Sequence, residues 1–144
     1  GADARVVNLS SAAQSPVDLD ALAGRRRLSD MAAYSQSKLA ITAWTTLLAE
    51  SLGPSGPVLV SVNPGSMLGS KMVRDAFGVA GRDISIGADI LVRAALDPAF
   101  ADASGRYFDN DAGRFGRPHP HALDANRSAV LVRALDDLWS RLSP

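Results

Sequence analysis

The stretch Tyr34-Ser-Gln-Ser-Lys38 decides how the chain is interpreted, because it lies between two apolar runs that end in small polar residues. The run before it is Arg5-Val-Val-Asn-Leu-Ser-Ser11, and the run after it is Val58-Leu-Val-Ser-Val-Asn-Pro-Gly65. Such short apolar runs predict buried parallel strands. On a helix between them, Tyr34 and Lys38 share one face, about one turn apart. A cation so close favours the phenolate, so the tyrosine can give and take a proton.

The rest of the pattern alternates between strand and helix signals. Apolar runs predict strands at 6–9, 58–62 and 105–109, and helical spacing predicts helices at 33–52, 87–96 and 122–142. Residues 12–32 and 110–120 are expected to be loops, with one helical turn at 19–23, and residues 66–83 are mixed. The order strand–helix–strand–helix–strand plus a closing helix predicts an α/β fold with a parallel sheet.

This fold class predicts where the polar residues meet. Ligands of a parallel sheet bind beyond the C-terminal ends of its strands. Ser11 ends the first strand, and Pro64-Gly65 ends the second. The helix between these strands starts at the same end and carries Tyr34 and Lys38 in its first turns. We therefore expect all of these residues to face one crevice.

The order of these motifs resembles the second half of short-chain dehydrogenases/reductases. The stretch Tyr34-Ser-Gln-Ser-Lys38-Leu39-Ala40 and the polar loop around Arg25-Arg26-Arg27 look like the retinol-dehydrogenase-like branch of that family. The resemblance implies a hydride transfer between a nicotinamide cofactor, NAD or NADP, and a carbonyl or secondary-alcohol substrate. It implies that Tyr34 is the acid/base and that Lys38 assists it and holds the nicotinamide ribose.

Three further site residues follow from the same resemblance. Ser11, the second serine of its pair, would polarise the substrate oxygen. Pro64 and Gly65 would begin the segment that holds the nicotinamide. The family usually has a threonine five positions after this proline; that position is Gly69 here, and Ser70 is expected to take its place.

The cofactor half of such an enzyme has no counterpart in residues 1–144. The family opens with a strand, a glycine-rich turn and a helix that hold the cofactor pyrophosphate. No Gly-x-Gly-x-x-Gly follows an apolar strand in this sequence. We interpret residues 1–144 as the C-terminal, catalytic and substrate-side half of a Rossmann-type doubly wound sheet. Such a half is expected to be inactive alone, to expose a sheet edge and to form a homo-oligomer.

Composition excludes several other classes of function. A net charge of +0 gives no electrostatic reason to expect nucleic acid or a membrane surface as a partner. With no cysteine there is no thiolate metal site, and no long apolar run is present, so a cytoplasmic protein is expected. His119 and His121 have no nearby carboxylate cluster, and Asp109-Asn-Asp111 lacks the later residues of a calcium loop. We therefore expect no metal.

Two alternative functions remain open at the level of the sequence. A non-catalytic module could retain the same half-fold for oligomerisation or binding. A related dehydratase or epimerase could use the same tyrosine and lysine, although Asn63-Pro64-Gly65 fits the reductase type better.

Overall fold

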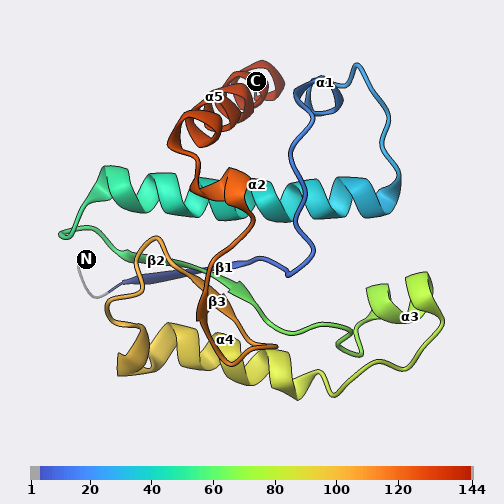
Figure 1. Ribbon diagram of the computed structural model, residues 1–144, viewed down its shortest axis with the longest axis vertical. Helices are drawn as coiled ribbons and strands as arrows, with labels where there is room; N and C mark the ends of the chain where they lie inside the picture. Colours follow the sequence, from blue (N-terminus) through green and yellow to red (C-terminus); the bar gives the residue numbers. More distant parts are fainter. Residues whose placement is uncertain (1–3, 144) are drawn as a thin grey trace.

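The computed structural model describes residues 4–143 and has a parallel sheet between helical layers (Figure 1). The first three strands are parallel, and the fourth is antiparallel to the third. The predicted α/β class and its parallel sheet are thereby confirmed. In spatial order the strands are β1 (Arg5–Leu9), β2 (Val58–Asn63), β3 (Tyr107–Asp109) and β4 (Arg114–Gly116).

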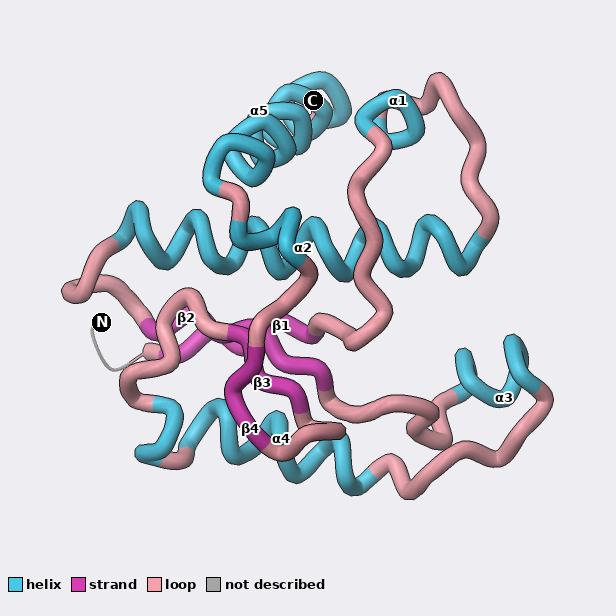
Figure 2. The backbone as a smooth tube through the Cα atoms, in the orientation of Figure 1, coloured by secondary structure: helices cyan, strands magenta, loops and turns pink. Residues whose placement is uncertain are grey.

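Helices cover both faces of this sheet. Figure 2 shows α2 (Asp30–Leu52) on one face and α4 (Ser85–Leu96) on the other. The short α1 (Leu19–Leu22) and the closing α5 (Ala125–Leu142) lie on the outer side of α2. The remaining helical elements are α3 (Lys71–Phe77), which projects beyond the sheet, and two 3₁₀ turns, η1 (Pro98–Phe100) and η2 (Pro120–Leu123).

Two of these elements were not expected from the sequence. The helix α3 lies in the mixed segment, where the Ser70 hydroxyl caps it by accepting from the Val73 amide at 3.3 Å. The strand β4 lies in the expected loop 110–120 and forms a hairpin with β3. With only three residues, β4 is too short to show an alternating pattern.

The core between the sheet and α4 explains why β4 forms. Phe115 of β4 packs against Phe100 and Phe108, with ring centroids 5.2 and 5.1 Å apart. Val60 and Val62 of β2 complete this cluster and are fully buried. Such aromatic contacts add to the free energy of burying the rings. Phe115 therefore anchors the short strand to the core, in addition to the pairing of β4 with β3.

The contact between α2 and the sheet is made by small and hydroxyl side chains. Thr42, Thr45 and Ala49 are buried there. The Asn8 amide donates to the Thr45 hydroxyl at 2.8 Å, and the Ser10 and Thr42 hydroxyls are 2.6 Å apart. The large apolar residues of α2 turn elsewhere: Leu39 packs with Leu131 of α5. The apolar face that helical spacing predicts is thus largely the outer face of this helix.

The strand β1 forms one edge of the sheet. Val6 and Leu9 are 40% and 48% exposed, and alternation along the strand places them on opposite faces. A second apolar surface is the groove of about 510 Å³ between α1, α2 and α5, which Trp44 and Leu135 line. Open edges and apolar surfaces of this kind favour association with another chain.

We predict that the 144-residue chain forms a homodimer or a larger assembly through the β1 edge, the outer face of α2, or both. Light scattering after size exclusion measures the mass. Val6→Lys should weaken the assembly if the edge takes part, because a lysine on an edge strand opposes strand pairing. A monodisperse monomer with a cooperative melt would contradict the prediction.

Candidate active site

Tyr34 and Lys38 lie where α2 begins, beside the C-terminal end of β1. The hydroxyl of Ser29 caps the helix by accepting from the Ala32 amide at 3.3 Å. The Lys38 Nζ donates to the carbonyl oxygen of Leu9 at 3.0 Å and lies 5.5 Å from the centre of the Tyr34 ring. Partial burial lowers the pKa of Lys38 from its ordinary value. The ammonium is thus anchored to the strand and held next to the tyrosine.

The two serines after β1 have different surroundings. Ser10 is only 3% exposed, and its hydroxyl contacts Thr42 and the Lys38 carbonyl oxygen. Ser11 is half-buried, and its hydroxyl accepts from the Ala13 amide at 3.1 Å. Ser10 is therefore occupied in joining β1 to α2, and Ser11 is the serine with a hydroxyl nearer to solvent.

The second tyrosine of the chain, Tyr107, is a poor candidate for proton exchange. It is 6% exposed, and its hydroxyl donates to the Ser11 carbonyl oxygen at 3.2 Å. Burial, with the charges of Asp109 and Asp111, raises its pKa to about 12. Tyr107 therefore stays protonated at neutral pH and serves to fix the backbone at Ser11.

The turn after β2 is held by a polar network. Asn63 is buried; its side-chain oxygen accepts from the Gly65 amide at 3.2 Å, and its amide donates to Asp109 at 2.9 Å and Asp111 at 3.0 Å. The Asn110 amide donates to the Pro64 carbonyl oxygen at 2.9 Å. Gly65 has φ +129°, a conformation that other residues rarely adopt. The Pro64–Gly65 turn is thus fixed by side chains of the β3–β4 turn.

Sequence reasoning missed this network. It weighed Asp109 and Asp111 only as a calcium loop, whereas the structure uses them as hydrogen-bond acceptors for Asn63. Among residues 4–143 no three His, Cys, Asp or Glu side chains come together in a way that could hold a metal ion. The position of these residues in the sequence could have revealed the network. Asp109 and Asp111 lie at the end of one predicted parallel strand, and Asn63 lies at the end of another.

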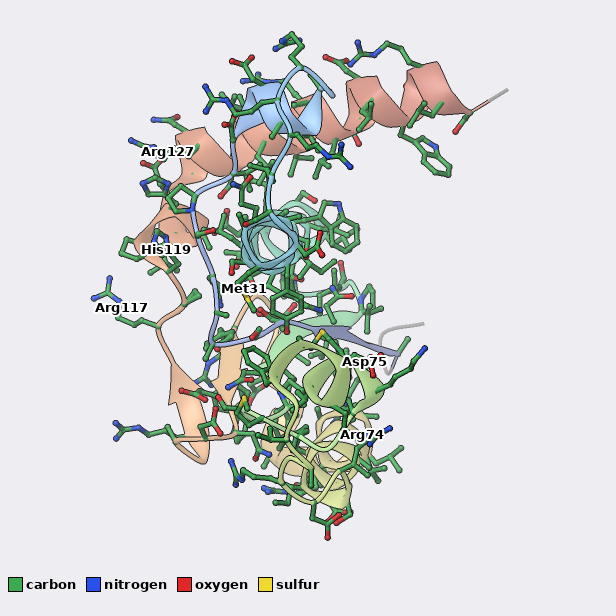
Figure 3. All side chains as sticks on the ribbon, turned by 90° about the vertical axis from the view of Figure 1, so that its right-hand side faces the viewer. Met31, Arg74, Asp75, Arg117, His119 and Arg127 are labelled. Atoms are coloured by element: carbon green, nitrogen blue, oxygen red, sulfur yellow. The ribbon has the colours of Figure 1, made fainter. Side chains whose placement is uncertain are left out.

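The expected site residues differ in how closely the structure joins them. Tyr34, Lys38 and the end of β1 form one contact set. Ser70 is the N-cap of α3, so the structure gives its hydroxyl a local partner. The two histidines also pack locally: their rings are 5.1 Å apart, and the His121 amide donates to His119 Nδ1. Figure 3 shows the end of the molecule where α2 begins, with Met31 above Arg74 and Asp75 of α3.

Comparisons with known proteins bear on the family that the chain resembles. No family model matches the chain. The chain is 31% identical over 140 residues to Homo sapiens retinol dehydrogenase 13, and 33% identical over 120 residues to Mus musculus retinol dehydrogenase 12. These alignments span 85% and 76% of the chain. The resemblance to short-chain dehydrogenases/reductases is confirmed.

A comparison with solved structures finds a protein of similar fold. An uncharacterised protein from Mycobacterium paratuberculosis, of known crystal structure, superposes on 93% of the chain with a TM-score of 0.66 and 29% identity. The chain spans 42% and 38% of the two retinol dehydrogenases and 49% of the mycobacterial protein. The similarity therefore covers most of this chain but only part of each relative.

None of the helices within residues 4–143 combines the length and the apolar composition that a membrane crossing requires.

Asp111 gives a test of the network by pH. Partial burial opposes its charge, but the Ser66 amide and hydroxyl, Asn63 and Arg82 hold its pKa below the ordinary value. A depressed folded-state pKa stabilises the fold above the unfolded pKa, and this stabilisation is lost as pH falls through the folded value. We predict that Asp111→Asn lowers the free energy of unfolding by about 1 kcal/mol at pH 7.

The difference from wild type should shrink as pH falls from about 4, the ordinary value of a free carboxyl, through the lower pKa of the folded protein, where its carboxylate becomes protonated. Chemical denaturation at several pH values measures it, with the exposed Asp75→Asn as control. A difference that stays constant down to pH ~2 would show that the charge of Asp111 is not what stabilises the network.

Proposed function

We propose that this chain is the catalytic and substrate-side half of an NAD(P)-dependent oxidoreductase that acts on a carbonyl or secondary alcohol. The observation that carries the proposal is the position of Lys38, with its Nζ bonded to the Leu9 carbonyl oxygen and 5.5 Å from the Tyr34 ring. The relatives named as dehydrogenases support oxidoreduction as the activity of the parent family. NAD and NADP remain equally compatible with these residues.

The residues present fit the nicotinamide side of such a cofactor. An ammonium has three donors, and one Lys38 donor is used by Leu9, so two remain for the ribose hydroxyls. A Cβ added to Gly65 would have Leu68 and Asp111 as its nearest neighbours, all at ordinary contact distances. A bound nicotinamide would supply or accept the hydride. We assign Pro64 and Gly65 to the wall that positions it.

The residues of the chain would handle the proton. In the reducing direction the Tyr34 hydroxyl donates a proton to the substrate oxygen, and in the oxidising direction the phenolate removes it. The Lys38 ammonium stabilises that phenolate through its charge. The Ser11 hydroxyl donates a hydrogen bond to the same substrate oxygen, as the charge on that oxygen develops. Tyr107 supports this arrangement by holding the Ser11 backbone.

The surroundings of the crevice favour an apolar substrate. Met67, Met72, Phe77 and Val79 in and around α3 are 41–51% exposed. They lie in the segment that projects beyond the strand ends, on the side where α2 begins (Figure 1). Apolar side chains in such a segment can cover an apolar ligand and exclude water. The name of the retinol dehydrogenases describes an apolar alcohol as their substrate, which agrees with this choice.

We predict the following in a dehydrogenase domain that joins this chain to a cofactor half. Tyr34→Phe should reduce turnover about 10²–10⁴-fold, as is typical of general acid/base groups. Lys38→Met should impair both turnover and cofactor binding, and Ser11→Ala should lower turnover with less effect on cofactor affinity. Steady-state kinetics with direct cofactor-binding measurements separate these effects.

Tyr107→Phe is the matched control, because it removes the other tyrosine hydroxyl of the chain. It should destabilise the fold and change turnover far less than Tyr34→Phe. If Tyr34→Phe leaves turnover intact, the acid/base assignment is wrong. If the wild-type joined domain itself shows no turnover, the non-catalytic module becomes the better interpretation.

We further predict that the 144-residue chain alone shows no oxidoreductase activity and no NAD(H) or NADP(H) binding tighter than about millimolar. The pyrophosphate and adenosine contacts of this family come from the glycine-rich half. Isothermal titration calorimetry measures the affinity. Micromolar binding would show that residues 1–144 contain a phosphate site of a different kind.

A further inference from the structure

The segment between β2 and α4 is a loop closed at its base by two backbone hydrogen bonds. The Gly69 amide donates to the Arg82 carbonyl oxygen, and the Arg82 amide donates to the Met67 carbonyl oxygen, both at 2.7 Å. Leu68 and Arg82 accordingly form an isolated parallel bridge. We call residues 66–69 and 81–82 the neck, and residues 70–80, which include α3, the lid. Within residues 66–82, this bridge between the two sides of the neck is the one strand-like pairing.

Glycines make this close approach possible. A Cβ added to Gly81 would lie 2.7 Å from the Gly69 Cα, and one added to Gly69 would lie 2.8 Å from the Ala80 carbonyl oxygen. Met67 adopts φ +54°, which is costly for a residue with a side chain. The two strands of backbone in the neck are therefore packed tightly, and the backbone at Met67 is strained. The two backbone hydrogen bonds oppose this strain, and further side-chain contacts would help them.

Asp111 contacts both sides of the neck from the β3–β4 turn. On one side its carboxylate accepts from the Ser66 amide at 3.0 Å and also from the Ser66 hydroxyl. On the other side it accepts from Arg82 Nη1 at 3.1 Å. It also accepts from the Asn63 amide at 3.0 Å, at the end of β2. The Asp111 side chain is 28% exposed, so water weakens these bonds only in part.

We propose that Asp111 is the positioning residue that clasps the neck and thereby fixes the lid relative to the Pro64–Gly65 turn. One carboxylate joins the two ends of the lid and the wall of the crevice. The effect on substrate binding rests on the proposed function, whereas the clasp itself does not. Asp111 touches no reacting group and acts only through the segment that it holds.

The chemistry of the contacts requires a carboxylate. Three of the groups that face Asp111 can only donate: the Ser66 amide, the Asn63 amide and the Arg82 guanidinium. An ionised carboxylate offers acceptors only, on two oxygens. An asparagine would direct its NH₂ group at one of these donors, so at least one contact becomes repulsive. Asp111→Asn therefore breaks the clasp with almost no change in volume.

Hydrogen exchange of the 144-residue chain, followed by mass spectrometry, tests the clasp directly. Asp111→Asn should speed exchange in peptides from residues 66–82 about tenfold or more, and in peptides from β2 and α4 by no more than the about fivefold that its smaller effect on global stability gives. Asp75→Asn is the matched control, since it makes the same change on the exposed surface of α3 (Figure 3). It should leave exchange at the neck as in wild type.

Arg82→Gln is a second variant that removes the contact with one side of the neck only. It should speed exchange at residues 66–69 and 81–82 while Asn63 keeps its bond to Asp111. The proposal is overturned if both variants exchange at the neck as slowly as wild type. Uniform acceleration in all peptides would also overturn it, because Asp111 would then stabilise the whole fold rather than the lid.

Kinetics in a joined dehydrogenase domain separate the clasp from the proposed chemistry. Asp111→Asn should raise KM for an apolar alcohol about tenfold with kcat changed much less, because a loose lid weakens substrate binding. Equal losses in kcat and kcat/KM would contradict the substrate role of the lid. The hydrogen-exchange measurement does not depend on enzyme activity. Failure of the proposed function in the kinetics would therefore not be mistaken for failure of the clasp.

Discussion

The parallel pairing of β1 with β2 is the constraint on which the rest of the structure depends. Leu9 pairs with Val62, and the Ser10 amide continues the ladder by donating to the Val62 carbonyl oxygen at 2.8 Å. The segments that follow β1 and β2 therefore leave the sheet at the same level and at one end, and α2 begins at that same end (Figure 1). If β1 paired with β2 in a different register, the two segments would leave the sheet at different levels and the candidate site residues would lie farther apart.

A second layer of contacts holds the residues of the candidate site in place. Lys38 bonds to the last carbonyl oxygen of β1, Tyr107 bonds to the Ser11 carbonyl oxygen, and Asn63 binds both carboxylates of the β3–β4 turn. Each bond joins a residue at or next to the candidate site to an element that the core already fixes. The site is thus an extension of the sheet, and β4 contributes to it by holding the turn that carries Asp111.

The sequence was sufficient to predict the α/β class, the parallel strands and the helix of Tyr34, because buried strands and long helices have strong apolar patterns. It failed for α3 and β4, which are short and stabilised by a cap and by Phe115, respectively. It also predicted apolar spacing on α2 without showing which face meets the sheet. Thr42 and Thr45 are buried there because their hydroxyls pair with Ser10 and Asn8, a tertiary match that periodicity does not encode.

The central claim is that one crevice at the strand ends binds the nicotinamide side of the cofactor. NMR chemical-shift mapping of the 144-residue chain with nicotinamide mononucleotide at tens of millimolar, roughly the concentration that weak binding requires, tests it most directly. The account predicts shifts at the amides of Ser11, Tyr34, Lys38 and Gly65. The account would be contradicted if the shifts were confined to the groove between α1, α2 and α5. It would also be contradicted if no amide shifted at the highest of these ligand concentrations.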